Sequence, residues 1–199
     1  MKRIIGVECW ADYYFFSKLL LDEKLIRKEK NKQEVVKGII ERSKGGFSIG
    51  IVDHDNEDLI SYIKKKYKVG SKNECEIENS VLICDEINIV KIKNHPYFII
   101  QLLPNEFENW IIRFLENNCN KSLTEFGYTN FEEFKNDSKV IYERLINNEK
   151  FITLIRFVLK SQADSENYIN KLKIILEYLI EKNYSVDINK LKNIWAIKN

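Results

Sequence analysis

The sequence predicts an α/β fold in which a mostly parallel β-sheet is flanked by helices and followed by an α-helical C-terminal part. Strand-like apolar runs alternate with helical periodicity up to residue 104, and from residue 106 onward only helical periodicity remains. Glycine (7) and proline (2) are scarce, which favours long helices over a many-turned β-sandwich. We therefore expect an α/β domain over residues 1–104 and a helical subdomain over residues 105–199.

The first part of the chain contains two strand-like runs separated by helices. Residues 3–8 and 47–52 are apolar and have the length of a buried strand. Asp12 is the expected N-cap of the first helix, and the charged residues 22–32 are expected to form a connection. The helices predicted from periodicity span residues 12–21, 33–43 and 56–68.

The pattern then changes to further strands. Residues 80–93 are expected to form β structure that turns at Asp85-Glu86, and residues 97–103 form another apolar run. Strands that follow crossover helices lie parallel in one sheet, joined by right-handed connections. This order predicts a largely parallel sheet with covering helices.

The second part of the chain has helical periodicity throughout. We expect it to pack on the sheet or to cover it as a lid, and to be available for a protein partner or a second copy of the chain. The predicted helices span residues 106–118, 129–148, 150–161 and 165–183.

Composition excludes several classes of protein. The 32 basic and 30 acidic residues of the 199 give a net charge of +2, which excludes a histone-like nucleic-acid binder. No two of the four cysteines have Cys-x-x-Cys spacing and there are two histidines, so the sequence does not indicate a zinc site. No apolar run approaches the roughly 20 residues that span a bilayer. We expect a cytoplasmic protein with reduced thiols and no membrane contact.

Carboxylates follow two of the predicted strands at the point where each strand ends. Glu8 ends the first strand, and Asp53 and Asp55 follow the strand at residues 47–52. The carboxyl ends of parallel strands meet at one edge of a sheet, so these three side chains are expected to converge there. Three acids repel one another unless a hard cation lies between them, and carboxylates suit Mg²⁺ or Mn²⁺. The chemistry indicated is phosphoryl transfer or phosphodiester hydrolysis.

Each of these acids taken alone has a structural explanation. An aspartate after a strand commonly caps the next helix, and Glu8 could be a strand end exposed to solvent. The joint pattern favours a site, because a strand ending in glutamate is followed 45 positions later by a strand ending in Asp-x-Asp, with two helices between them.

This joint pattern resembles the Toprim domain, which topoisomerases, bacterial primases, small M5-type ribonucleases and OLD-family nucleases share. Glu8 in GVECWAD matches the glutamate of that family, and Asp53 and Asp55 in GIVDHD match its Asp-x-Asp. The resemblance covers roughly residues 1–104. It implies a small Rossmann-like sheet on which Glu8, Asp53 and Asp55 are the catalytic and metal-binding residues, with Mg²⁺ or Mn²⁺ as cofactor and a nucleic-acid backbone as substrate.

A basic segment lies between the acidic motifs. Residues 24–44 contain eight basic and three acidic side chains, a surplus of five in a nearly neutral chain. If this segment reaches the acidic edge, its cations could hold phosphates; the alternative is a charged loop exposed to solvent. The residues expected to contact nucleic acid are Arg27, Lys28, Lys30, Asn31 and Lys32.

Three further residues have a structural and a functional interpretation. Glu106 and Glu108 begin the helix after the last strand, where acids favour the helix dipole, and Glu108 could also be a further metal ligand or a base. His54 lies between the two aspartates, so on a strand it points to the opposite side, which favours a structural role.

We interpret the chain as a stand-alone Toprim-like, metal-dependent nuclease for DNA or RNA. The resemblance allows a role as an effector in phage defence or in RNA processing. It is too short for the extra domains of a topoisomerase, and it lacks the zinc module of a primase. One alternative is a non-catalytic regulatory or protein-interaction module that keeps a residual Toprim fold. The other is a small-molecule phosphohydrolase that uses the same acids.

Overall fold

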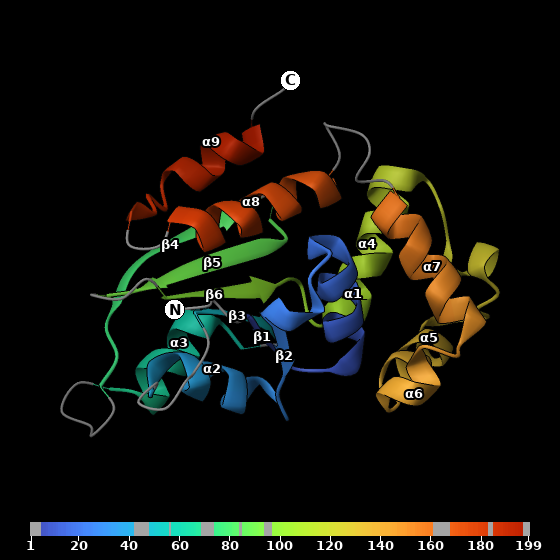
Figure 1. Ribbon diagram of the computed structural model, residues 1–199, viewed down its shortest axis with the longest axis horizontal. Helices are drawn as coiled ribbons and strands as arrows, with labels where there is room; N and C mark the ends of the chain where they lie inside the picture. Colours follow the sequence, from blue (N-terminus) through green and yellow to red (C-terminus); the bar gives the residue numbers. More distant parts are fainter. Residues whose placement is uncertain are drawn as a thin grey trace.

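The computed structural model describes residues 5–41, 48–55, 57–68, 74–83, 85–93, 97–160, 168–182 and 185–196. In this part of the chain, six strands form one sheet in the order β2-β1-β3-β6-β5-β4 (Figure 1). The strands are β1 (Ile5–Val7), β2 (Ile26–Lys28), β3 (Ile49–Asp53), β4 (Ile77–Ile83), β5 (Ile87–Ile92) and β6 (Tyr97–Leu102).

The sheet is mixed. The neighbours β2, β1, β3 and β6 are parallel, whereas β5 and β4 are antiparallel additions to β6. Strands separated by only a few residues must reverse direction, and only a few residues separate β4 from β5 and β5 from β6. The predicted turn at Asp85-Glu86 is confirmed, because β4 ends at Ile83 and β5 begins at Ile87. The α/β class is confirmed, but the predicted largely parallel sheet holds only for its first four strands.

Helices account for most of the remaining described chain, and the regular elements described from α4 onward are all helical, as predicted. They are α1 (Trp10–Leu20), α2 (Lys32–Ile40), α3 (Leu59–Lys66), α4 (Phe107–Cys119), α5 (Phe131–Ser138), α6 (Tyr142–Leu145), α7 (Glu149–Lys160), α8 (Tyr168–Lys182) and α9 (Lys190–Ala196), with short 3₁₀ turns at Glu23–Leu25 and Leu123–Phe126. None of the described helices combines the length and the apolar character that crossing a bilayer requires.

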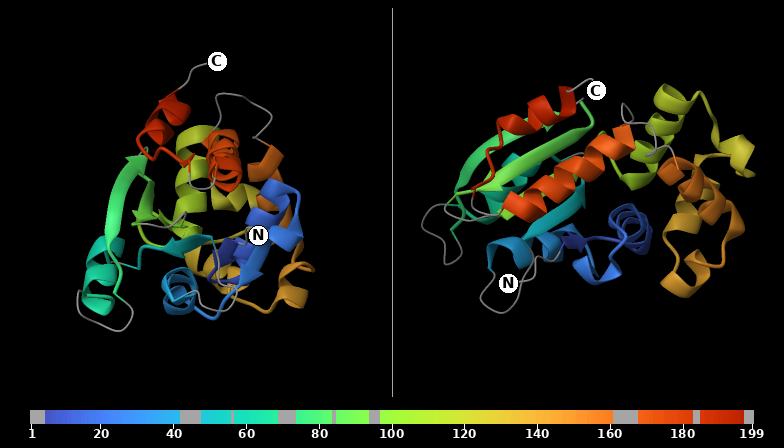
Figure 2. Two further views of the ribbon diagram at one scale, coloured as in Figure 1. Left: turned by 60° about the vertical axis from the view of Figure 1, so that its left-hand side comes forward. Right: turned by 45° about the horizontal axis from the view of Figure 1, so that its top comes forward.

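Helices cover both faces of the sheet. Ile51 and Ile100 face the core shared with α1, α4, α8 and α9, whereas Val52 and Ile99 face the core under α2 and α3. Figure 2 shows these two sets of helices on opposite sides of the strands. Because both faces are buried, the central strands are apolar at almost every position, which is why they appear in the sequence as continuous apolar runs.

Buried aromatic side chains join the helical part to the α/β part. The ring of Phe15 on α1 packs edge-on against Phe107 and Trp110 of α4, with ring centroids 5.6 and 5.5 Å apart. The indole nitrogen of Trp110 donates a hydrogen bond to the Tyr168 hydroxyl on α8 at 2.5 Å. The predicted domain division at residue 104 stays a prediction, since this core includes side chains from both parts.

Three local predictions were wrong. The segment 22–32 is not only a connection, because β2 adds an edge strand beside β1; of its three residues Ile26 alone is buried, which is too little for a strand pattern. The helix predicted over residues 129–148 is broken into α5 and α6, since the backbone at Ile141 is extended. The helix α9 was not predicted at all.

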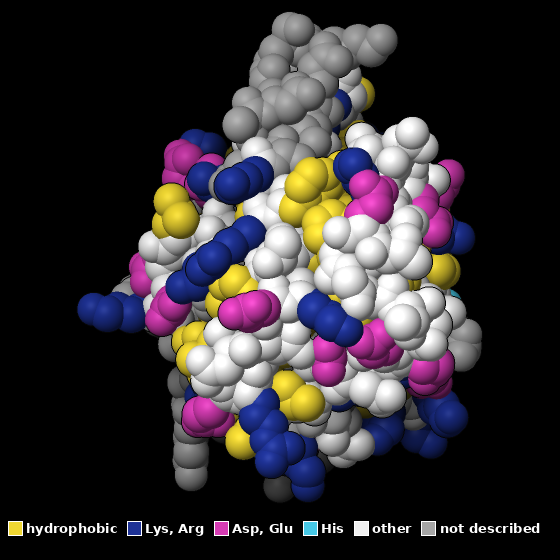
Figure 3. All heavy atoms as spheres, turned by 90° about the vertical axis from the view of Figure 1, so that its right-hand side faces the viewer, with side chains coloured by type: hydrophobic (Ala, Val, Ile, Leu, Met, Phe, Trp, Pro, Cys, Tyr) yellow, Lys and Arg dark blue, Asp and Glu magenta, His cyan; other side chains and the backbone are white. Residues whose placement is uncertain are grey.

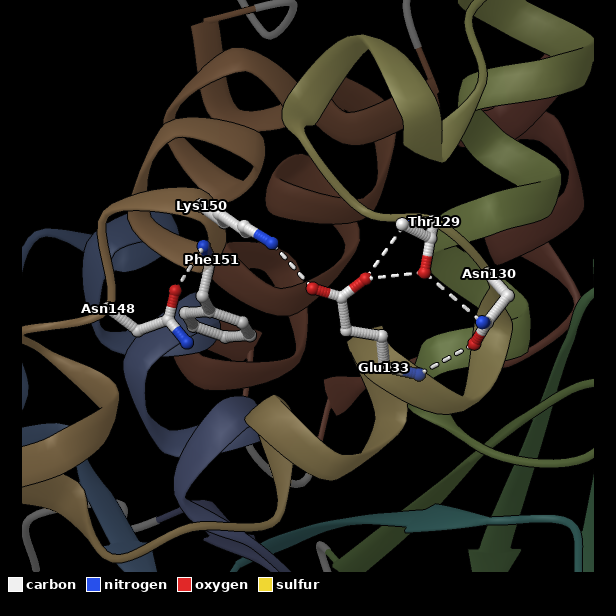
Figure 4. Close-up of polar contacts among 6 residues, drawn as sticks. All are labelled: Thr129, Asn130, Glu133, Asn148, Lys150 and Phe151. Carbon is white, nitrogen blue, oxygen red and sulfur yellow. Dashed lines mark hydrogen bonds and ion pairs between the residues drawn. The ribbon is translucent and has the colours of Figure 1, made fainter.

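Polar side chains fix the starts of α5 and α7 (Figure 4). The Asn130 side chain caps α5 by accepting from the Glu133 backbone at 3.0 Å, and the Glu133 carboxylate accepts from the backbone and hydroxyl of Thr129. That carboxylate also pairs with Lys150, while Asn148 accepts from the Phe151 backbone at the start of α7. These contacts hold the two helices side by side.

Figure 3 shows basic and acidic side chains mixed over this end of the molecule, so that face carries no field of a single sign.

Candidate functional site

The structure brings Glu8 and Asp53 into direct contact. The parallel pairing of β1 with β3 aligns Ile5 with Ile49, so both strands end at the same edge of the sheet. The backbone nitrogen of Asp53 donates a hydrogen bond to Glu8 Oε1 at 2.7 Å. In Figure 1 the helices α1, α4 and α5 lie beyond this edge. Glu8 and Asp53 are therefore adjacent at this edge, but the contact joins the Glu8 carboxylate to the Asp53 backbone rather than to the Asp53 carboxylate.

The start of α4 is attached to the same edge. Asp53 Oδ1 accepts a hydrogen bond from the Phe107 backbone at 2.9 Å, so the carboxylate lies at the positive end of the helix dipole. The carbonyl of Asn105 accepts from the backbone nitrogens of His54 and Asp55 at 2.6 and 3.0 Å. These bonds fix the loop after β3 against the loop after β6. They also place Glu108, in the first turn of α4, beside Glu8 and Asp53.

A pocket of about 290 Å³ opens at this edge. Seven of the nine predicted site residues line it, four of them acids and three from the basic segment. The lining residues are Glu8, Cys9, Trp10, Lys28, Lys30, Asn31, Asp53, Asp55, Glu106, Glu108, Ser138, Lys139 and Val140. Anionic groups and cationic side chains therefore face one small space.

Two residues of the predicted basic set lie elsewhere. Arg27 is exposed on β2 and pairs with Glu29, with Nε 2.8 Å from the carboxylate. Lys32 is buried: its ammonium donates to the His54 carbonyl at 3.0 Å and lies 4.0 Å from the Asp55 carboxylate. Lys32 thus adds positive charge beside the loop after β3, next to Asp55, and does not line the pocket.

Burial and mutual repulsion perturb the carboxylates. Burial, helped by the charges of Asp12 and Asp55, raises the pKa of Glu8 to about 8, although the hydrogen bond from Asp53 and the charge of Lys32 oppose the shift. Burial and the neighbouring Asp12 and Glu8 raise the pKa of Asp53 well above its ordinary value. A group of acids that holds its protons this strongly gains stability from a bound cation.

Glu108 and Glu106 have different environments. Glu108 is buried, and burial raises its pKa against the effect of a hydrogen bond with the Ser138 hydroxyl. Glu106 is also partly buried, but contacts with Lys135 and Lys139 hold its pKa below the ordinary value. Both glutamates line the pocket, but Glu106 is ion-paired with Lys135 and Lys139, whereas Glu108 is not ion-paired within the described chain.

His54 lies in the loop just after β3, so the strand alternation on which its predicted orientation rests does not apply. Its Nδ1 pairs with the side-chain amide of Gln101 at 3.0 Å, and the same amide donates to the Glu57 carbonyl at 3.0 Å. Gln101 is buried on β6. The imidazole therefore attaches the loop after β3 to strand β6.

Three polar residues at the site were not predicted, namely Asp12, Ser138 and Lys139. Asp12 is not the N-cap of α1: Cys9 is, and its sulfur accepts from the Asp12 backbone while Asp12 Oδ2 accepts from the Cys9 backbone at 3.2 Å. Asp12 is buried, and burial together with the Glu108 charge raises its pKa to about 7. Cysteine is an unusual cap, which hid this capping box in the sequence. Ser138 comes from a distant helix, and no sequence signal connects it to the acids.

The side chains as they stand do not form a complete metal site. Among the described residues, no group of three or more histidine, cysteine, aspartate or glutamate side chains is gathered closely enough to hold an ion. The donor type nevertheless fits Mg²⁺ or Mn²⁺, because Glu8 and Asp53 each accept a single hydrogen bond within the described chain and each keeps a second carboxylate oxygen. The predicted ligands Glu8, Asp53, Asp55 and Glu108 would have to turn toward a shared ion.

Comparison with known proteins gives no family for this chain. No family model, no curated protein and no solved structure matches it. The resemblance to the Toprim domain rests on the Glu and Asp-x-Asp motifs of the sequence.

Proposed function

We propose that the protein is a metal-dependent nuclease that hydrolyses phosphodiester bonds in DNA or RNA. The observation that carries the proposal is the contact of Glu8 with Asp53 at neighbouring ends of parallel strands, in a pocket that lysines also line. Ligands of open α/β sheets bind at this edge. The resemblance of the same residues to the Toprim motif supports the same chemistry.

The residues of the pocket have distinct roles in this proposal. Glu8, Asp53 and Asp55 hold a divalent cation, with Glu108 as a further ligand; when bound, the ion polarises the phosphate and acidifies water. Lys28, Lys30 and Lys139 line the same pocket and offset the charge of the nucleic-acid backbone.

An alternative role for Glu8, in place of a metal ligand, is that of a general acid or base. Burial raises its pKa to about 8, so it can release or accept a proton near neutral pH. Efficient general acids and bases have a pKa near the operating pH. Lys32 is close enough to lower this pKa and thus to tune it.

The direct test is cleavage by purified wild-type protein and two isosteric variants, Glu8→Gln and Asp53→Asn. Plasmid DNA, tRNA and free nucleotides are incubated with each protein in Mg²⁺, Mn²⁺ or EDTA. We expect the wild type to cut a polymer only with metal, and both variants to lose at least about tenfold in rate. Glu23→Gln is the matched control, since Glu23 pairs with Lys18 on the surface at 2.8 Å.

The outcomes separate the candidate functions. Cleavage that persists in EDTA or in both variants contradicts the proposal, as does the lack of any cleavage by the wild type. Release of phosphate from nucleotides without cleavage of polymers would identify a small-molecule phosphohydrolase instead.

A second candidate is a non-catalytic regulatory module. It is favoured by the use of Glu8 and Asp53 as structural hydrogen-bond acceptors, and by the absence of a three-ligand cluster among the described residues. Thermal unfolding with and without Mn²⁺ separates the candidates. A metal-binding site gives a rise in Tm that disappears in Asp53→Asn, whereas a residual site gives no metal-dependent rise in either protein.

A further inference from the structure

Two adjoining pockets flank the acids. The second pocket, of about 390 Å³, is lined by Asp55, Asn105, Glu106, Asn109, Phe131 and Lys135. It shares Asp55 and Glu106 with the pocket that contains Glu8 and Asp53. Together they form a path that leads from β2, past the acidic edge of the sheet, to the start of α5.

An aromatic ring beside a lysine lines the first pocket. The Lys28 ammonium lies over the Trp10 ring, 5.4 Å from its centroid, and both residues belong to the pocket wall. Trp10 is only half-buried, but its ring is held by Tyr13 and Tyr142 at centroid distances of 5.5 and 5.2 Å. The tryptophan therefore forms a rigid aromatic surface next to a cation.

The same combination lines the second pocket. The Lys135 ammonium lies 5.6 Å from the centroid of the half-buried Phe131 ring. Each pocket thus has in its wall an aromatic ring with a lysine ammonium over it, and Asp55 and Glu106 line both pockets. A nucleotide presents the complementary arrangement, a flat base joined to an anionic phosphate.

We propose that the two pockets bind neighbouring nucleotides of an unpaired nucleic-acid strand, with one base on Trp10, the other on Phe131, and the phosphate between them over Glu8 and Asp53. This inference rests on the proposed nuclease function and specifies its substrate as single-stranded DNA or RNA.

The accessibility of the base faces favours an unpaired strand. Each pocket volume is close to the lower end of the range for sites that hold one small molecule, which is room for about one nucleotide unit. In a duplex the base faces are stacked and cannot reach a side chain unless the nucleotide is extruded. In a single strand every base has an available face.

The test measures binding and cleavage of a short oligothymidylate, an oligouridylate and a duplex of the same length. Trp10→Leu and Phe131→Leu remove the π-face and keep an apolar side chain, whereas Trp10→Phe keeps a ring. Stacking of one base predicts a loss of single-strand affinity of about 5- to 150-fold in each leucine variant, and about threefold or less in Trp10→Phe. Trp195→Leu is the matched control, because Trp195 also has a lysine over its ring, Lys171 at 5.9 Å, but lines neither pocket.

The outcomes distinguish this inference from the function on which it rests. Selective loss of single-strand affinity in both leucine variants, with Trp195→Leu unchanged, supports it. If the wild type cuts nucleic acid but prefers duplex, or if the leucine variants bind single strands as the wild type does, the inference is overturned and the nuclease function stands. If the wild type neither binds nor cuts any of the three probes, both are overturned.

Discussion

Replacement of Glu8 by glutamine should stabilise the metal-free protein, and increasingly so as the pH rises. Glutamine keeps the oxygen that accepts from the Asp53 backbone but removes a charge that burial and the neighbouring Asp12 disfavour. The folded state holds the Glu8 proton more tightly than the unfolded chain does. The wild type therefore loses stability as the pH rises from the ordinary pKa of 4.5 toward the folded value of about 8.

The magnitude follows from these two pKa values. Between about pH 6 and about pH 8, ionisation of Glu8 lowers the free energy of unfolding of the wild type by about 2 kcal/mol, a cost that Glu8→Gln does not have. For a chain of 199 residues this corresponds to a relative gain in Tm of roughly 4–8 °C for the variant.

Thermal unfolding followed by circular dichroism in EDTA, at several pH values, measures this difference. Glu23→Gln removes a surface carboxylate and serves as the matched control, for which we expect at most about 1 kcal/mol at any pH. The reasoning is refuted if the Tm difference between Glu8→Gln and the wild type stays constant or shrinks as the pH rises.

Three further substitutions test the packing around the site. In Gly50→Ala the new Cβ would lie 2.9 Å from Val35 Cγ1, so overpacking should cost about 1–3 kcal/mol; urea unfolding that shows no loss would contradict this. Asn130→Ala removes the cap on the Glu133 nitrogen and should cost about 1 kcal/mol, measured as a lower Tm. Glu106→Gln breaks two lysine contacts and should destabilise by about 1 kcal/mol near neutral pH. Because the folded pKa of Glu106 is lowered, the destabilisation caused by Glu106→Gln should disappear as the pH falls through this pKa. A destabilisation that persists in acid would refute the stabilising role given to the two lysine contacts.

The part of the fold that the sequence predicts is the part governed by local patterns. Apolar runs identified β1 and β3, and the acids that follow them identified Glu8 and Asp53 as neighbours across 45 positions. The edge strand β2 has one buried residue, so it has no pattern of its own and forms only because β1 offers a partner. The antiparallel pairing of β4 with β5 follows from the predicted turn at Asp85-Glu86. The antiparallel pairing of β5 with β6 was not predicted, because an apolar run does not reveal the direction of its strand.

The site was predictable where charge and strand position coincide, and hidden where it depends on packing. Ser138 and Lys139 reach the pocket because α5 packs against α4, a contact between segments about 30 residues apart that no motif marks. Lys32 belongs to a basic run expected to contact nucleic acid, with a solvent-exposed loop as the alternative, yet the fold buries its ammonium against the His54 carbonyl. Burial decides the role of a charged side chain, and burial depends on the tertiary structure.

Calorimetric titration of Mn²⁺ into the wild type and Asp53→Asn tests the central claim most directly. Asparagine keeps an oxygen that can accept from the Phe107 backbone, so the variant should fold while losing a charged ligand. The account predicts that the wild type binds Mn²⁺ and that the variant binds at least about tenfold more weakly. Equal binding by both proteins, or none by the wild type, would contradict a cation site formed by Glu8 and Asp53.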